Sequence, residues 1–140
     1  MTDVFSKAKR SAVMARIRSH GNRATELALV ALFRRHGFTG WRRRQPVFGK
    51  PDFLFRQARL AVFVDGCFWH GCPRHGTLPA THRAFWRRKF AANRARDRRV
   101  NRELQRRNWR VLRLWEHELR PKNEPRLLRR LIRAGVAGQG

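Results

Sequence analysis

Two short apolar runs on either side of a four-residue linker constrain the fold of this chain most. The runs are residues 51–55 and 60–64, and the linker is Arg56-Gln-Ala-Arg59. Apolar runs of this length around a short turn are typical of a β-hairpin. The second run is continuously apolar, which predicts a fully buried central strand. We therefore expect the hairpin to form the centre of a sheet.

The register of this hairpin would bring two carboxylates together. If Gln57 and Ala58 are the loop residues, Asp52 pairs with Phe63. Asp65 is then the diagonal neighbour of Asp52 on the same face, with Cα atoms roughly 7 to 8 Å apart. Carboxylates at that separation can share one divalent cation, although a slip of one residue would move Asp65 to the other face. The alternative is that both acids are turn residues that end strands.

A long helix is predicted from residue 81 to about residue 107. Its inward-facing stripe has members three or four positions apart, and these are Trp86, Phe90, Asn93, Asp97, Val100 and Leu104. Two members of the stripe are polar, and a buried polar group needs a partner. We therefore expect Asn93 and Asp97 to face the acids of the hairpin. In the alternative interpretation Asp97 pairs only with a neighbouring arginine of its own helix, Arg94, Arg96 or Arg98.

Shorter signals predict the remaining elements. Helices are expected over residues 7–18, 25–35 and 125–134, and strands over 41–45 and 110–115. The second of these helices is apolar almost all round and is expected to be buried. Its first turn contains Glu26, where the helix dipole alone is sufficient reason for an acid. The expected fold is α/β, with a basic helical arm (1–20), one domain (21–135) and a frayed tail (136–140).

The charge of the chain points to a polyanionic partner. Lysine and arginine total 34 against nine aspartate and glutamate residues, a formal net charge of +25. Nucleic acid is the first choice for such a chain. No stretch approaches the roughly 18 uninterrupted apolar residues of a membrane span, and no signal-peptide core opens the chain. We therefore expect a soluble intracellular protein with no membrane partner.

A cluster of metal-ligand residues follows the hairpin. Cys67, Cys72 and His75 form a Cys-x4-Cys-x2-His run within a loop rich in glycine and proline. In a reducing compartment this pattern favours a tetrahedral structural zinc site over a disulfide. The fourth ligand must come from elsewhere. His117 is the first choice because it follows a strand expected beside the hairpin, and His82 is the rival.

One further histidine stands outside this ligand set. His70 lies five residues beyond Asp65. An imidazole there can take a proton from water near neutral pH, and His70 is therefore a candidate general base.

Several stretches of the chain resemble the very-short-patch mismatch repair (Vsr) endonucleases, a zinc-containing branch of the PD-(D/E)xK nuclease superfamily. They cover residues 6 to 120 in order, and among them are Gly49-Lys-Pro-Asp-Phe53, Val62-Phe-Val-Asp-Gly-Cys-Phe-Trp-His-Gly-Cys72, Arg96-Asp-Arg-Arg99 and Asn108-Trp-Arg-Val-Leu112. The string from Gly66 to Cys72 is highly specific. The resemblance implies a restriction-endonuclease-like mixed sheet flanked by helices, with a structural zinc site.

The resemblance also implies an activity. The protein would be a cytoplasmic, nucleoid-associated bacterial enzyme that acts as a monomer on double-stranded DNA. It would bind the T:G mismatch left by deamination of 5-methylcytosine, make a Mg²⁺-dependent nick on the 5′ side of the mispaired T, and so start very-short-patch repair. Mismatch-repair proteins are further candidate partners.

Residue roles are implied position by position. Asp52 would be the main Mg²⁺ ligand with the carbonyl of Val64, and His70 would be the general base. The supporting acids would be Asp65, Asp97 and Glu26. The DNA-binding residues would be Met14, Phe68, Trp69, Trp86 and Asn93, and the zinc ligands would be Cys67, Cys72, His75 and His117.

The chain departs from the superfamily pattern at one charged position. The motif lysine is missing after Asp65, where Gly66 and Cys67 stand, so its charge role is expected to fall to His70 or to a second metal ion. Three other functions stay open: a zinc-stabilised DNA-binding module without chemistry, a PD-(D/E)xK nuclease with no T:G preference, and a basic RNA-binding or ribosomal protein.

Overall fold

The computed structural model describes residues 23–66 and 82–137. Along the chain the elements are α2 (Arg23–Arg35), β1 (Trp41–Arg43), β2 (Phe53–Phe55), β3 (Leu60–Asp65), α3 (Arg83–Arg106), β4 (Arg110–Trp115), the 3-10 turns η1 (Glu116–Leu119) and η2 (Pro121–Asn123), and α4 (Glu124–Arg133). The predicted arm over residues 1–20 and the cysteine-containing loop lie outside the described residues.

The strands form one mixed sheet. Their order is β1-β2-β3-β4, with antiparallel pairing from β1 to β3 and parallel pairing of β3 with β4. Central β3 is buried along its whole length, as its continuous apolar run predicts. The expected α/β class with a mixed sheet is thus confirmed.

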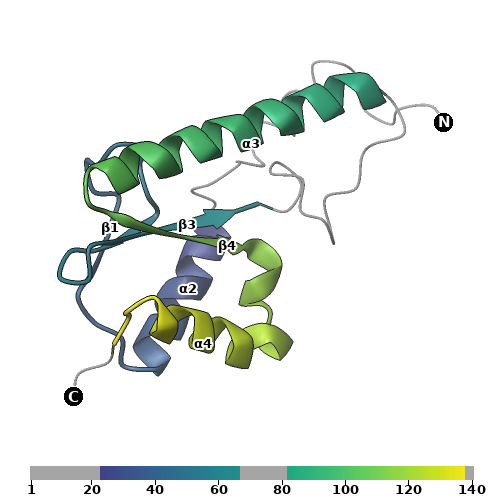
Figure 1. Ribbon diagram of the computed structural model, residues 1–140. Coiled ribbons are helices and arrows are strands. Elements are labelled where there is room, and N and C mark those ends of the chain that lie inside the picture. The colour runs from purple at the N-terminus through teal and green to yellow at the C-terminus, as the bar shows by residue number, and fades with distance from the viewer. Residues whose placement is uncertain (1–22, 67–81, 138–140) are drawn as a thin grey trace.

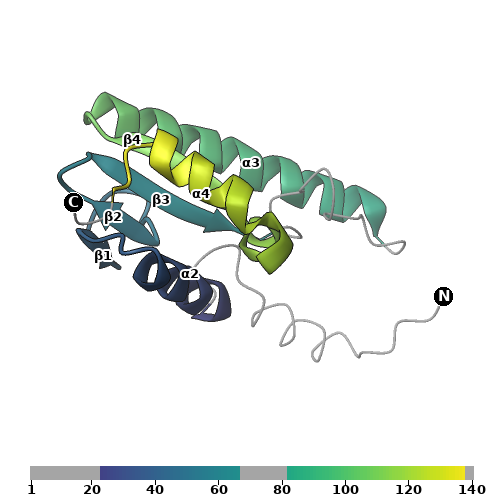
Figure 2. The ribbon, with the colours of Figure 1, turned by 90° about the horizontal axis from the view of Figure 1, so that it is seen from below.

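Helices cover both faces of this sheet (Figures 1 and 2). Helix α3 lies along one face, and α2 and α4 lie against the other. The alternation of side chains along each strand divides the core accordingly. Phe53 and Val62 pack towards α2 and α4, whereas Leu54 and Phe63 pack in a second cluster with Leu104 of α3. The acids of the hairpin therefore belong to a sheet that is covered on both sides.

The predicted hairpin register is confirmed. Phe53 pairs with Val62, Leu54 with Ala61 and Phe55 with Leu60. The turn closes through a hydrogen bond of 3.1 Å from the backbone N–H of Arg59 to the carbonyl of Arg56. Extending this register by one pair sets Asp52 opposite Phe63, which leaves Asp65 as its diagonal neighbour.

Both long helices end on residues in the left-handed conformation. Gly37 has a φ of 68°, and the N–H of Phe38 donates to the carbonyl of Phe33 at 2.8 Å. Asn108 likewise has a φ of 68°, and the N–H of Trp109 donates to the carbonyl of Leu104 at 2.9 Å. These bonds satisfy carbonyls at the last turn of each helix. The predicted ends of both helices are confirmed.

One sequence prediction about burial is wrong. Helix α2 is not buried all round, because Leu27 is 46% exposed while Leu29 and Phe33 on the other side are fully buried. Beyond α4, Val136 is 2% exposed and its N–H donates to the carbonyl of Leu131. Among the described residues, no helix is both long and apolar enough to cross a membrane.

Candidate active site

Asp52 lies immediately before β2 and is held across the hairpin. It is 3% exposed, and its Oδ2 accepts a hydrogen bond of 2.8 Å from the backbone N–H of Val64 on β3. A bond from a backbone donor fixes a carboxylate without neutralising its charge. Asp52 is therefore a buried acid positioned at the carboxyl end of the central strand.

The segment that leads into Asp52 packs closely against α3. Gly49 has a φ of 80°, and a Cβ built on it would lie 2.5 Å from Cγ1 of Val100 and 3.6 Å from the ring of Phe63. Lys50 is also in the left-handed region, with a φ of 51°. Only glycine fits both this backbone and this close approach. The tight contact sets where the chain enters β2.

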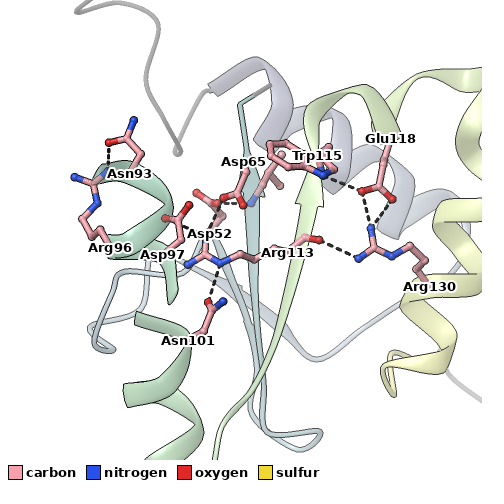
Figure 3. Close-up of polar contacts among 11 residues, drawn as sticks. Asp52, Asp65, Asn93, Arg96, Asp97, Asn101, Arg113, Trp115, Glu118 and Arg130 are labelled. Atoms are coloured by element: carbon pink, nitrogen blue, oxygen red, sulfur yellow. Dashed lines mark hydrogen bonds and ion pairs between the residues drawn. The ribbon is translucent and has the colours of Figure 1, made fainter. Parts of the chain in front are cut away.

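Asp65 and Asp97 converge on one guanidinium group. Nη1 of Arg113, on β4, lies 2.9 Å from Oδ1 of Asp65 and 3.6 Å from Oδ1 of Asp97. Figure 3 shows Asp52, Asp65 and Asp97 facing the same space from the hairpin and from α3. The structure thus brings together the acids that the sequence analysis predicted to meet. Arg113, an arginine of the sheet, is thus a partner of Asp97.

The amide of Asn93 belongs to the same helix stripe. Asn93 is 4% exposed, and its Oδ1 accepts a hydrogen bond of 3.3 Å from Arg96. Phe90 lies one helical turn before Asn93, and Trp86 lies two turns before it. Trp86 is 8% exposed, and its ring centroid is 6.1 Å from that of Phe90. The predicted stripe is confirmed as the buried face of α3. A role for Trp86 in DNA stays a prediction, and it would require this ring to be uncovered.

Glu26 makes its ion pairs with arginines on and next to β1. Its Oε2 lies 2.6 Å from Nη2 of Arg43 and 3.5 Å from Nη2 of Arg44, and the residue is 2% exposed. A buried carboxylate with two cationic partners has a structural reason to be present. The catalytic part implied for Glu26 stays a prediction.

Asp52 is placed to contribute a carboxylate to a divalent metal ion. Within residues 23–66 and 82–137, no three His, Cys, Asp or Glu side chains form a group that could hold a metal ion. Mg²⁺ keeps several waters and is commonly bound by one or two carboxylates together with substrate phosphate oxygens. Asp52 beside the backbone of Val64 fits that requirement.

Most of the predicted zinc and DNA-binding residues lie outside the described part of the chain, and so does the candidate general base, His70. The zinc and DNA-binding residues concerned are Met14, Cys67, Phe68, Trp69, Cys72 and His75. Of the alternatives for the fourth zinc ligand, His117 is 7% exposed in η1, whereas His82 is exposed just before α3. The parallel register pairs Asp65 with Trp115, so Cys67 and His117 each follow that pair by two residues.

Sequence reasoning missed Arg113 as a site residue. It is the one charged residue between Val111 and Trp115 in a strand that packs on both faces. An arginine inside such a strand requires an acidic partner. That requirement was readable from the sequence, but which acid it meets depends on the pairing of β4 with β3.

The chain is strongly basic, and its mixed sheet brings acids together at the end of the central strand. These two features are typical of metal-assisted enzymes that act on nucleic acid. The comparisons with known proteins are more specific. The family described as DNA mismatch endonuclease Vsr matches residues 2–75. The chain belongs to this family, and the prediction that it is a DNA endonuclease is confirmed.

Similar curated proteins carry two kinds of name. DNA mismatch endonuclease Vsr of Escherichia coli (strain K12) is 38% identical over 127 residues, covering 89% of this chain and 80% of that protein. Type II nicking enzyme V.XorIIP of Xanthomonas oryzae pv. oryzae is 40% identical over 121 residues, covering 85% and 88%. Type II nicking enzyme V.NaeI of Lentzea aerocolonigenes is 54% identical over 69 residues, which span 49% of this chain but only 42% of that relative.

Proposed function

We propose that this protein nicks double-stranded DNA on the 5′ side of the mispaired T in a T:G mismatch, as the first step of very-short-patch repair. Membership of the Vsr family supports a DNA nicking activity. We further propose that the four-stranded sheet is the core of a restriction-endonuclease-like fold. The single observation that carries the proposal is that Asp52, held by the N–H of Val64, faces the same space as Asp65 and Asp97, which share Arg113 (Figure 3).

In the proposed site, the Asp52 carboxylate and the Val64 carbonyl would hold Mg²⁺. A bound Mg²⁺ would stabilise the negative charge that develops on the phosphate oxygens during hydrolysis. The hydrogen bond from the N–H of Val64 keeps Asp52 in place before metal binds. His70 would take the proton from the attacking water. Glu26 and Asp97 would hold the water molecules bound to the metal ion, and Asp65 would be a further acid of the site.

The same proposal assigns the DNA contacts. Phe68, Trp69 and Trp86 would insert into the base stack beside the mismatch, and Met14 would reach the minor groove. Unstacking costs least at a mispair, so that deformability becomes part of recognition. The net charge of +25 supports binding to the phosphate backbone.

A structural zinc ion is the further cofactor that we propose. Cys67, Cys72 and His75 would be three of its ligands. The burial of His117 at the end of β4, next to the strand that leads into Cys67, supports it as the fourth. Two thiolates and two imidazoles make a closed tetrahedral zinc site.

The test compares duplexes that differ only in T:G or C:G at one position, incubated with Mg²⁺. We expect one nick, on the strand that carries the mispaired T. Asp52→Asn should lower the nicking rate by on the order of a hundredfold or more, because it removes the charged metal ligand. Glu103→Gln is the matched control, since this acid lies at the far end of α3 and pairs with Arg106. Full activity of Asp52→Asn would reject the site.

A second candidate is nicking at a fixed DNA sequence without a mismatch. The names of V.XorIIP and V.NaeI, both type II nicking enzymes, favour it. The same pair of duplexes separates the two functions. Equal cleavage of T:G and C:G duplexes supports the second candidate and rejects mismatch specificity.

A further inference from the structure

Lys50 has a strained backbone two residues before Asp52. Its φ is 51°, in the left-handed region that residues with a Cβ disfavour. It also precedes Pro51, and a residue before proline prefers an extended backbone with a φ of about −120°. Lys50 therefore departs from two local preferences at once. Such strain persists only where the surrounding structure imposes it, and it is common at functional sites.

The turn that ends at Lys50 is fixed to the end of α3. The N–H of Lys50 donates to the carbonyl of Val47 at 2.9 Å, which closes the turn. A Cβ built on Gly49 would lie 2.5 Å from a side chain of α3. The guanidinium group of Arg107, just beyond that helix, lies 5.1 Å from the ring centre of Phe48. These contacts hold the backbone of Lys50 in one place.

Other basic residues with a left-handed backbone use their side chains within the protein. The guanidinium of Arg59 (φ 53°) lies 4.0 Å from the ring centre of Trp109 and donates to the carbonyls of residues 107 and 108 at 2.9 and 3.2 Å. Arg44 (φ 52°) lies 3.5 Å from Glu26. Lys50 is exposed, and within residues 23–66 and 82–137 its ammonium group has no hydrogen-bond or ion-pair partner. Intramolecular contacts in the described part of the chain therefore do not account for a cation at position 50.

The position of Lys50 beside the candidate active site suggests a ligand for this cation. The Cα atoms of Lys50 and Asp52 are at most about 7 Å apart, because two residues of chain span no more than this. DNA that is cut at Asp52 must place its scissile phosphate there, and the next phosphates of the same strand follow closely. A lysine ammonium is a compact charge that binds phosphate oxygens. Lys50 is thus within reach of the strand that is cut.

We propose that Lys50 binds a DNA phosphate next to the scissile one, and that the strained turn holds it there before DNA arrives. This inference rests on the proposed metal site at Asp52. The contact positions the strand relative to the metal ligand. A cation that is fixed in advance loses less conformational freedom on binding than one on a mobile loop.

The first test measures binding of the full chain, as purified, to a fluorescent T:G duplex without Mg²⁺ between about 50 and 200 mM KCl. Lys50→Gln keeps the strained backbone but loses the charge, so it should bind roughly tenfold more weakly. Its slope of log K against log salt should be smaller by about one. Lys50→Arg should keep the wild-type slope. Lys122→Gln is the matched control and should also keep it, because this lysine is exposed but lies in η2 against α4.

A second test locates the contact on the DNA. A neutral methylphosphonate replaces each phosphate near the nick in turn, on the strand that is cut. At the phosphate that Lys50 binds, the neutral linkage should weaken wild-type binding roughly tenfold and leave the binding of Lys50→Gln unchanged. If no phosphate beside the scissile one behaves in this way, the inference is overturned.

Lys50→Gly separates the strain from the charge. Relief of the left-handed backbone should outweigh the greater chain entropy of glycine, so the urea midpoint should rise above that of wild-type protein. DNA binding should nevertheless weaken as in Lys50→Gln, and this variant carries the binding test if the glutamine variant does not fold. A midpoint equal to or below that of wild-type protein would overturn the role of the strained turn.

The outcomes separate this inference from the proposed function. If Lys50→Gln binds DNA with wild-type affinity and salt slope, the role of Lys50 is rejected even where wild-type protein nicks only T:G duplexes. If its slope falls by about one while T:G and C:G duplexes are nicked equally, the inference holds and mismatch specificity fails. Full nicking activity of Asp52→Asn would reject the metal site on which both proposals rest.

Discussion

The contact between Gly49 and α3 makes a quantitative prediction about how the active site is assembled. Gly49→Ala places a Cβ on a residue with a φ of 80°, 2.5 Å from Cγ1 of Val100. The left-handed backbone costs an alanine about 1–2 kcal/mol, and overpacking costs roughly 1–3 kcal/mol more. The methyl group of Val100 cannot turn away easily, because a β-branched side chain is restricted at χ1. We therefore expect a total loss of about 2–5 kcal/mol in the free energy of unfolding.

Gly40 is the matched control for the backbone part of this loss. It has a φ of 84°, and nothing lies within 4 Å of the Cβ that Gly40→Ala would add. This variant should lose only the backbone cost of about 1–2 kcal/mol. The difference between the two glycine variants therefore measures the steric part alone. Urea denaturation followed by circular dichroism gives both values.

Removing the opposing methyl group should relieve the clash. In Gly49→Ala combined with Val100→Ala, the nearest remaining atoms, the Cβ at position 100 and the ring of Phe63, lie 3.6 Å from the new Cβ, which is ordinary van der Waals contact. A double-mutant cycle should show a favourable coupling of about 1–3 kcal/mol. If Gly49→Ala costs no more than Gly40→Ala, or if the cycle shows no coupling, the segment before Asp52 does not press on α3 and the reasoning is refuted.

Two predictions concern ion pairs outside the group formed by Asp52, Asp65 and Asp97. Glu118→Gln should lower the free energy of unfolding by about 1–2 kcal/mol, because Arg130 is only partly exposed and would keep its charge without a carboxylate partner. Urea denaturation measures this loss, and an unchanged midpoint would contradict the prediction. Hydrogen bonds from Arg106 and Arg107 lower the pKa of Glu103 from 4.5 to about 2. This pair therefore stabilises the fold above pH 4.5 and loses that contribution as the pH falls through 2. The stability of Glu103→Gln should consequently fall less than that of wild-type protein between pH 4.5 and 2, and parallel pH profiles would reject this assignment.

The sequence determined those features that depend on local periodicity. A four-residue linker between two apolar runs was enough to predict the hairpin register, and the observed pairing of Phe53 with Val62 agrees with it. Spacings of three and four were enough to predict which face of α3 is buried, including Asn93 at 4% exposure. Such patterns succeed because side-chain direction follows from the repeat of the backbone itself.

Only the tertiary structure decided which charged groups meet. The residues of the pair Arg113 and Asp65 are 48 positions apart, and they meet because β4 pairs in parallel with β3. In the same way Glu26 pairs with Arg43 of β1, although the helix dipole alone would explain an acid at that position. The periodicity of the sequence predicts that a side chain points inwards. It does not predict which residue the side chain will contact, because that residue belongs to another element and its position depends on how the elements pack. The acids could therefore be predicted from the sequence, and the arginine that joins two of them could not.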